Sequence, residues 1–125
     1  MNYKPTVVFD LDGVIHSYVS GWQGVDVILD PPVPLIQEEI ERIRKAGYKV
    51  VVVSTRCADP AGMDAVKNYL DANGIVVDEV LAEKPPALVY IDDRAIRFDG
   101  DPRGLLEQIQ SFKPWHQQKQ GAGSQ

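Results

Sequence analysis

The fold is decided by the stretch TVVFDLDG, residues 6–13, near the start of the chain. Its first four residues are β-branched or aromatic and follow a proline, which predicts a short buried strand over residues 6–9. The strand leads directly into an acidic turn, Asp10-Leu11-Asp12-Gly13. We therefore expect two carboxylates just past the carboxyl end of a core strand.

Hydrophobic runs of the same kind occur twice more. Residues 48–53 (YKVVVV) form a nearly continuous run that ends at Ser54, and residues 88–91 (LVYI) end at two aspartates. A strand without polar alternation is expected where helices cover both faces of a parallel sheet. We therefore predict two more buried strands there, a short strand within residues 75–81 and a short edge strand over residues 95–98.

Three helices are predicted from the remaining signals. The first begins near Pro34, carries apolar residues at helical spacing and stops at Gly47. The second begins after Asp59, which can cap it in front of a proline at the first helical position, and ends at residues 73–74. The same Asp-Pro signal at residues 101–102 predicts the start of the third helix.

Two segments lack such periodicity. Residues 14–34 contain two glycines and three prolines, and we interpret them as a flap, irregular or a small hairpin, that projects from the first strand. Residues 114–125 are rich in Gln, Gly and Ser, which predicts a disordered tail. One domain over residues 1–113 is therefore expected.

Strands that alternate with helices indicate an α/β fold: a three-layer, Rossmann-like, doubly wound sheet that is mainly parallel. A length of 125 residues, 44% of them hydrophobic and 25% charged, is typical of one globular domain. The single cysteine, Cys57, excludes an internal disulfide and fits a reducing compartment. No apolar run approaches the length of a membrane span and no secretory signal is present, so we expect a cytoplasmic protein without a membrane partner.

Ligands of such sheets bind outside the carboxyl ends of the strands. The polar residues that follow strand ends are Asp10, Asp12, Ser54, Asp92 and Asp93, and Lys84 precedes the last of these strands. Four carboxylates on one rim repel each other, so the cluster should be stable mainly when a cation binds there. Carboxylate oxygens together with substrate phosphate suit Mg²⁺, which we predict as the cofactor.

The order and spacing of these residues resemble the haloacid dehalogenase-like (HAD) superfamily, which consists mostly of Mg²⁺-dependent phosphatases. Its four motifs correspond to Asp10-Leu11-Asp12-Gly13-Val14, the run ending at Ser54, Lys84, and the run ending at Asp93. The resemblance covers residues 5–112. Both positions at which family members insert cap domains hold only short segments here, so the resemblance implies a capless member whose site is open unless an oligomer covers it.

The resemblance implies a role for each matching residue. Asp10 would be the nucleophile and a metal ligand, and Asp12 the general acid/base, with its backbone carbonyl on the metal. Ser54 would hydrogen-bond the transferring phosphoryl group, and Lys84 would neutralise Asp10 and the phosphate.

The remaining metal and phosphate contacts are also implied by the resemblance. Asp93 would bind the metal directly, and Asp92 directly or through water. The backbone amides of Leu11 and Thr55 would complete the phosphate cradle.

Other side chains near the rim have two interpretations each. Arg56 would contact a substrate anion or pair with an acid of the site. Trp22, which lies on the flap as His16 does, would stack on a base or sugar ring of a substrate or pack the flap onto the body. Cys57 has no evident base beside it and is predicted to be structural. His116 lies in the predicted tail and is given no role.

The function predicted from the sequence is a Mg²⁺-dependent phosphohydrolase that acts through an aspartyl-phosphate at Asp10. The substrate would be a phosphomonoester such as a nucleotide, a sugar phosphate or a nucleic-acid end. A net charge of −5 disfavours long nucleic acid as a partner. The alternatives are a phospho-accepting module like a receiver domain, which normally has its acceptor on a middle strand, and a relative that kept the fold without catalysis. Phosphotransfer and hydrolysis share the aspartyl-phosphate step and are not separated by the sequence.

Overall fold

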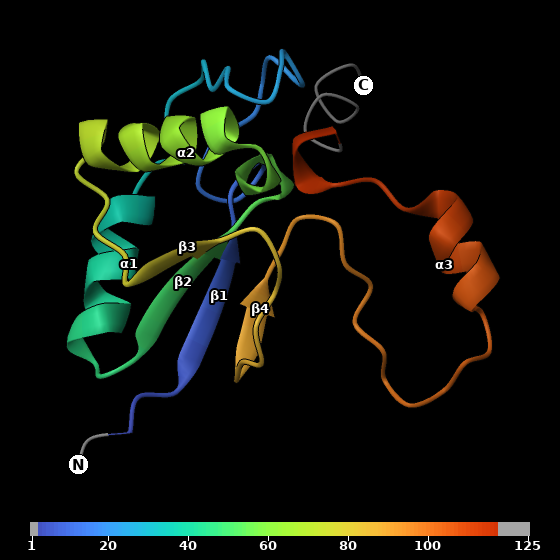
Figure 1. Ribbon diagram of the computed structural model, residues 1–125. Coiled ribbons are helices and arrows are strands. Elements are labelled where there is room, and N and C mark those ends of the chain that lie inside the picture. The colour runs from blue at the N-terminus through green and yellow to red at the C-terminus, as the bar shows by residue number, and fades with distance from the viewer. Residues whose placement is uncertain (1–2, 118–125) are drawn as a thin grey trace.

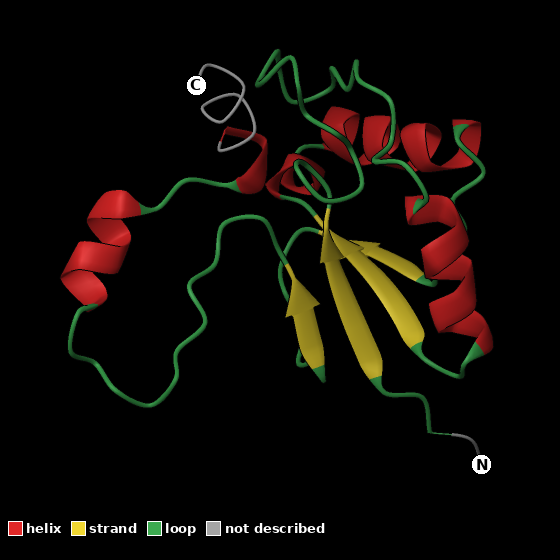
Figure 2. Ribbon diagram, turned by 180° about the vertical axis from the view of Figure 1, so that it is seen from behind, coloured by secondary structure: helices red, strands yellow, loops and turns green. Residues whose placement is uncertain are grey.

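The computed structural model describes residues 3–117 and contains one parallel β-sheet, the helices α1, α2 and α3, and a helical turn at residues 115–117 (Figures 1 and 2). The strands run in the order β3-β2-β1-β4 across the sheet. The elements are β1 (Thr6–Asp10), α1 (Ile36–Lys45), β2 (Lys49–Val53), the 3₁₀ turn η1 (Thr55–Ala58), α2 (Pro60–Ala72), β3 (Glu79–Leu81), β4 (Val89–Ile91) and α3 (Leu105–Ser111). The chain is thus an α/β protein with a Rossmann-like parallel sheet, as predicted.

The two central strands form the core of the domain. β1 pairs in parallel with β2, with Val7 opposite Val50 and Phe9 opposite Val52. These side chains lie on the face that α1 and α2 cover, and both helices lie on that side in Figure 1. The opposite face buries a smaller cluster against Ala87, which belongs to the segment that links β3 to β4. Because both faces of β1 and β2 are covered, their valines leave almost no exposed surface.

The start of α2 and the end of α1 follow the predicted local signals. α2 begins after Asp59, whose Oδ1 accepts a hydrogen bond of 2.9 Å from the amide of Ala61, with Pro60 at the first helical position. α1 ends before Gly47, which adopts a positive φ. The flap over residues 14–34 contains isolated bridges but no strand, so it has the irregular form rather than that of a hairpin.

The sequence interpretation was wrong for three features in the last third of the chain. β4 was predicted to be buried, but it is an edge strand, with Val89 46% and Tyr90 44% exposed. Residues 95–98 form no strand. α3 begins at Leu105 after Gly104 and not at the predicted Asp101-Pro102 signal; it has no buried residue and lies away from the sheet in both views. Local sequence signals do not show whether a neighbouring strand is available for pairing or which element covers a side chain.

The predicted disordered tail starts too early. Residues 114–117 lie against the end of the sheet that carries the predicted site, and Trp115 and His116 form hydrogen bonds there. The part of the prediction that covers residues 118–125 lies outside the described residues. Within residues 3–117, none of the helices combines the length and the apolar character that crossing a bilayer requires.

Gly62 allows α2 to approach the loop after β2. A Cβ at this position would overlap the backbone carbonyl of Arg56. We expect Gly62→Ala to lower the free energy of unfolding by about 2–3 kcal/mol, because rigid backbone would have to move. Urea unfolding measures this change, with Ala61→Ser on the exposed side of the same turn as the control. Equal stability of the two variants would show that α2 can shift without cost.

Candidate active site

Parallel strands place the candidate site residues at one edge of the sheet. Asp10 ends β1, Ser54 follows β2, and the two aspartates of the fourth motif follow β4. They line a cleft of about 360 Å³, whose other lining residues come from the turn after β1, the flap, the end of β2 with the start of η1, and the segments on either side of β4. The lining residues are Asp10, Asp12, Tyr18, Trp22, Val53, Ser54, Thr55, Lys84, Asp92, Asp93 and Arg94. The sequence prediction of one polar rim therefore agrees with the geometry.

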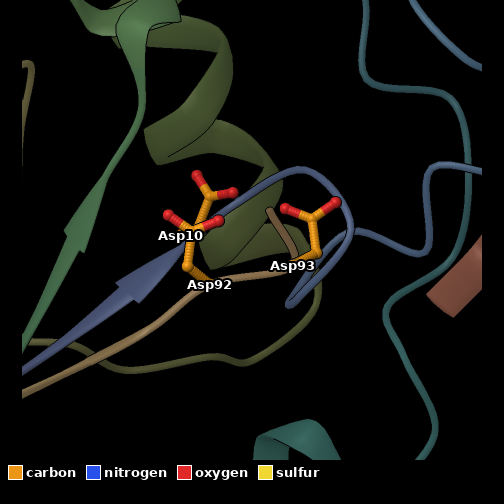
Figure 3. Close-up of side chains that lie close together, drawn as sticks. All are labelled: Asp10, Asp92 and Asp93. Carbon is orange, nitrogen blue, oxygen red and sulfur yellow. The ribbon is translucent and has the colours of Figure 1, made fainter. Parts of the chain in front are cut away.

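Three of the carboxylates form a tight cluster. One oxygen each from Asp10, Asp92 and Asp93 lies within 4.8 Å of the others, as Figure 3 shows for the three side chains. Burial, together with the neighbouring Asp93 and Asp92, raises the pKa of Asp10 from its usual 3.8 to about 8. The carboxylates are thus too close for all to be ionised easily without a cation. Hard oxygen donors at this spacing fit a divalent ion such as Mg²⁺.

Asp92 is held by two donors. Lys84 Nζ lies 3.0 Å from Asp92 Oδ2, and the amide of Arg94 donates to Asp92 Oδ1 over 2.8 Å. Burial pushes the pKa of Asp92 upwards, but these donors outweigh it and hold the pKa below its usual value. Lys84 therefore pairs with Asp92, whereas the resemblance implies that it neutralises Asp10.

Asp93 fits against the turn that follows β1. Gly13 has a φ of 86°, and a Cβ there would overlap the Asp93 carboxylate. Glycine thus serves two needs at this position, since it adopts the left-handed conformation readily and leaves room for the aspartate. The Asp93 side chain is only 3% exposed, and its Oδ2 lies 3.0 Å from His116 Nε2.

The Asp12 carboxylate points away from the three-carboxylate cluster, toward an arginine and a histidine. Its Oδ2 accepts a hydrogen bond of 2.9 Å from Arg56 Nε, and its Oδ1 lies 2.8 Å from His16 Nδ1. The Nε2 of His16 accepts a hydrogen bond of 3.1 Å from the backbone amide of Asp30. Nδ1 therefore carries the ring hydrogen and donates a hydrogen bond to Asp12. Burial opposes ionisation of Asp12, but the bonds from His16 and Arg56 keep its pKa below the usual value.

The structure resolves the two interpretations of Arg56. Its side chain is fully buried and is occupied by Asp12 and by the backbone carbonyls of residues 24, 25 and 27. The assignment of Arg56 as a substrate contact is therefore wrong, and the ion-pair alternative is correct. A guanidinium suits this place because its several donors reach one carboxylate and three carbonyls at once.

Trp22 packs the flap onto the body, as one of its two interpretations predicts. Arg56 Cζ lies 4.5 Å from the centroid of the Trp22 ring, which is a favourable cation–π distance. The side chain remains 56% exposed and lines the cleft. Contact between Trp22 and a substrate stays a prediction.

The predicted phosphate cradle lies beside the carboxylates. Ser54 is buried, and its Oγ accepts the amide of Arg56 over 3.2 Å, which leaves its hydroxyl hydrogen available to a ligand. Thr55 lines the cleft next to it. The backbone amide of Leu11 faces the Asp10 carboxylate and lowers its pKa in part, while the Leu11 side chain is buried in the core. Cys57 is buried, which raises the pKa of its thiol and agrees with a structural role.

Two histidines that the sequence analysis did not assign to the site contact it. His16 comes four residues after Asp12, a spacing that a tight turn can close. His116 comes from the segment predicted to be disordered, and its partner Asp93 is 23 residues away. The position of His16 could have been inferred from the turn, whereas no local pattern points to His116.

Comparisons with known proteins add evidence on the fold. No protein-family model and no curated protein matches the sequence. Among solved structures, the crystal structure of a structural-genomics target from Vibrio cholerae is similar, with 21% sequence identity and a TM-score of 0.52. The match covers 74% of this chain and 83% of that chain. A likeness at this identity concerns the fold alone.

Proposed function

We propose that this protein is a Mg²⁺-dependent phosphohydrolase of the HAD-like type, acting on phosphomonoesters through an aspartyl-phosphate at Asp10. The main support is the group of three carboxylates, Asp10, Asp92 and Asp93, beside a hydroxyl and a lysine in one cleft. Crowding raises the pKa of Asp10, which a bound cation would offset. The proposal also includes the cytoplasmic location that the single cysteine favours.

The proposed reaction has two displacement steps at phosphorus. In the first, a carboxylate oxygen of Asp10 forms a bond to phosphorus, and the bond to the leaving oxygen breaks with its electron pair. In the second, water attacks the phosphorus of the acyl-phosphate, which releases inorganic phosphate and restores the Asp10 carboxylate. Mg²⁺ would supply charge neutralisation for Asp10 and for the phosphoryl oxygens.

Asp12 suits the second step in its ionised form. Hydrogen bonds from Arg56 and His16 keep it ionised, which is the form that accepts a proton from the attacking water. Protonation of the leaving oxygen in the first step requires Asp12 to receive a proton first. Substrates whose leaving group needs no proton, such as p-nitrophenyl phosphate, are therefore suitable for the first assay.

The cleft supports a broad substrate class rather than one compound. Its opening is bordered by Tyr18 and Trp22 of the flap, and no cap domain is present among the described residues. Phosphate would lie near Ser54 and Lys84, and the remainder of the substrate would extend past the flap. A nucleotide, a sugar phosphate or a nucleic-acid end fits this description, and the net charge of −5 disfavours a long nucleic acid.

The test is release of p-nitrophenol from p-nitrophenyl phosphate with Mg²⁺ and with EDTA. Ser54→Ala and Lys84→Met should each lower kcat by about 10²–10³, because each removes a donor to the transferring phosphoryl group. Lys45→Met is the matched control, since Lys45 is an exposed lysine that pairs with Glu41 on α1.

The outcomes of this assay separate the alternatives. Mg²⁺-dependent turnover that both site variants lose, and the control keeps, would support the proposal. Stable phosphorylation of the protein without turnover would indicate a phospho-accepting module instead. A folded wild-type protein that neither binds Mg²⁺ nor turns over would contradict the proposal and indicate a fold without catalysis.

A further inference from the structure

The C-terminal segment, residues 114–117, closes one side of the carboxylate cluster. Trp115 Nε1 donates a hydrogen bond of 2.6 Å to the carbonyl of Gly13, across 102 residues of sequence. His116 Nε2 lies 3.0 Å from Asp93 Oδ2. The segment therefore contacts both the turn after β1 and the acid after β4, which are the two elements that present the carboxylates.

His116 itself is held on more than one side. Its ring packs edge-to-face against Tyr18 and Trp115, with centroid separations of 5.9 and 5.6 Å. Its side chain is 10% exposed. A histidine packed in this way has few rotamers available, so its Nε2 keeps a fixed position relative to Asp93.

The contacts of Asp93 Oδ2 determine the direction in which the other carboxylate oxygen, Oδ1, points. Its Oδ2 lies at His116, and the carboxylate packs on the Cα side of Gly13, where a Cβ would not fit. Figure 3 shows one Asp93 oxygen directed toward Asp10 and Asp92 and the other directed away from them. A hydrogen bond to the outer oxygen thus orients the inner one toward the cluster.

We propose that His116 is a positioning residue that orients Asp93 for cation binding, so that the C-terminal segment completes the metal site. This inference rests on the proposed function, because it assumes that the three carboxylates bind a divalent cation. His116 is not a member of the group of candidate ligands found among the described residues. It acts through Asp93, in the way that hydrogen bonds from outer groups orient the ligands of metal sites.

Trp115 has a related role in this arrangement. Its hydrogen bond to Gly13 fixes the segment to the turn that carries Asp12, and its ring borders His116. Loss of the Trp115 donor should loosen the segment without removing the bond from His116 to Asp93. The effect of Trp115→Phe on cation binding is therefore expected to be smaller than that of His116→Ala.

The test is isothermal titration of the full chain with MgCl₂. His116→Ala should weaken Mg²⁺ binding by about 10–100-fold, which is the usual effect of losing an outer partner of a metal ligand. His116→Gln should bind within a few-fold of the wild type, because its amide can donate from nearly the same place. Gln117→Ala, on the same segment, is the matched control and should bind as the wild type does.

Two truncations test the segment as a whole. A chain that ends at Gln117 should keep the wild-type Kd for Mg²⁺, whereas a chain that ends at Lys113 should lose affinity at least as strongly as His116→Ala. The Tm of each metal-free variant, measured by circular dichroism, shows whether the fold is intact. If His116→Ala fails to fold, His116→Phe decides instead, because it keeps a ring against Tyr18 and Trp115 without a donor to Asp93, and wild-type Mg²⁺ affinity in it would overturn the positioning role.

The possible failures are distinguishable. Equal or tighter Mg²⁺ binding by a folded His116→Ala would overturn the positioning role and leave the proposed function in place, and tighter binding would show that His116 competes with the cation. A folded wild-type chain that binds no Mg²⁺ would overturn the proposed function and this inference together.

Discussion

Replacement of Asp10 by asparagine is expected to abolish Mg²⁺-dependent phosphatase activity and also to stabilise the metal-free protein at pH 8. Activity is lost because the amide cannot form the acyl-phosphate and carries no charge for the cation. Stability rises because Asp10 lies among Asp92 and Asp93 and is partly buried, which raises its pKa to about 8. A single substitution should therefore lower the activity and raise the stability of the metal-free protein at the same time.

The sign of the stability effect follows from the protons bound by each state. The folded protein keeps a proton on Asp10 up to about pH 8, whereas the unfolded chain releases it near the usual pKa of 3.8. Between these values the folded state binds more protons, so the wild type loses stability as the pH rises. Asparagine does not titrate. The difference should therefore be near zero at pH 4 and largest at pH 8 and above.

The expected gain for Asp10→Asn is about 2 kcal/mol at pH 8, after allowance for the solvent that still reaches Asp10. Thermal unfolding in EDTA between pH 4 and pH 9 measures it, with Asp64→Asn on the exposed face of α2 as the control. Added Mg²⁺ should raise the Tm of the wild type and leave that of Asp10→Asn unchanged. Parallel pH profiles for the two proteins would contradict this prediction, because they would show that folding does not raise the pKa of Asp10.

Substitution of Arg56 should have the largest effect on the fold. Its guanidinium is buried, and it pairs with Asp12 and with three carbonyls of the flap. Arg56→Met would leave one carboxylate and three carbonyls without these donors, and we expect a loss of about 3–5 kcal/mol. Arg56→Lys should recover only part of this, because an ammonium group cannot match the planar set of donors.

Urea unfolding of both variants measures the loss. Arg42→Met is the control, since Arg42 is exposed and pairs only with Glu39 on the same helix among its described ion pairs. That pair should contribute less than about 1 kcal/mol. Limited proteolysis adds a local readout, because the flap should become cleavable at residues 14–34 when its carbonyls lose the anchor. A stable Arg56→Met with a protected flap would show that other contacts hold the flap.

The sequence predicted the parts of the molecule that depend on neighbouring residues. The run ending at Asp10 and the run ending at Ser54 lie on adjacent parallel strands, because apolar β-branched residues specify buried strands locally. Asp59 caps α2 as expected for an aspartate before a proline. The convergence of Asp10 with Asp92 then follows from the topology, since parallel strands end at one edge.

The errors concern contacts between distant parts of the chain. Tyr90 lies in an apolar run, but its exposure depends on β4 being at the edge of the sheet. Arg56 is a residue type that often binds substrate anions. Only the path of the flap shows that its donors already bind backbone carbonyls. His116 follows a proline and a tryptophan in a segment without periodicity, so its partner could not be inferred from spacing.

The hydrogen bond between Trp115 and Gly13 has a consequence for protein synthesis. The turn that carries Gly13 and the tryptophan that binds it are 102 positions apart, so the turn is synthesised well before its partner. The four described strands end by Ile91, so all of them are synthesised before Trp115 is added. A chain cut short between Ile91 and Trp115 would therefore have all four strands but not this hydrogen bond, and under the proposal above it would bind a cation more weakly.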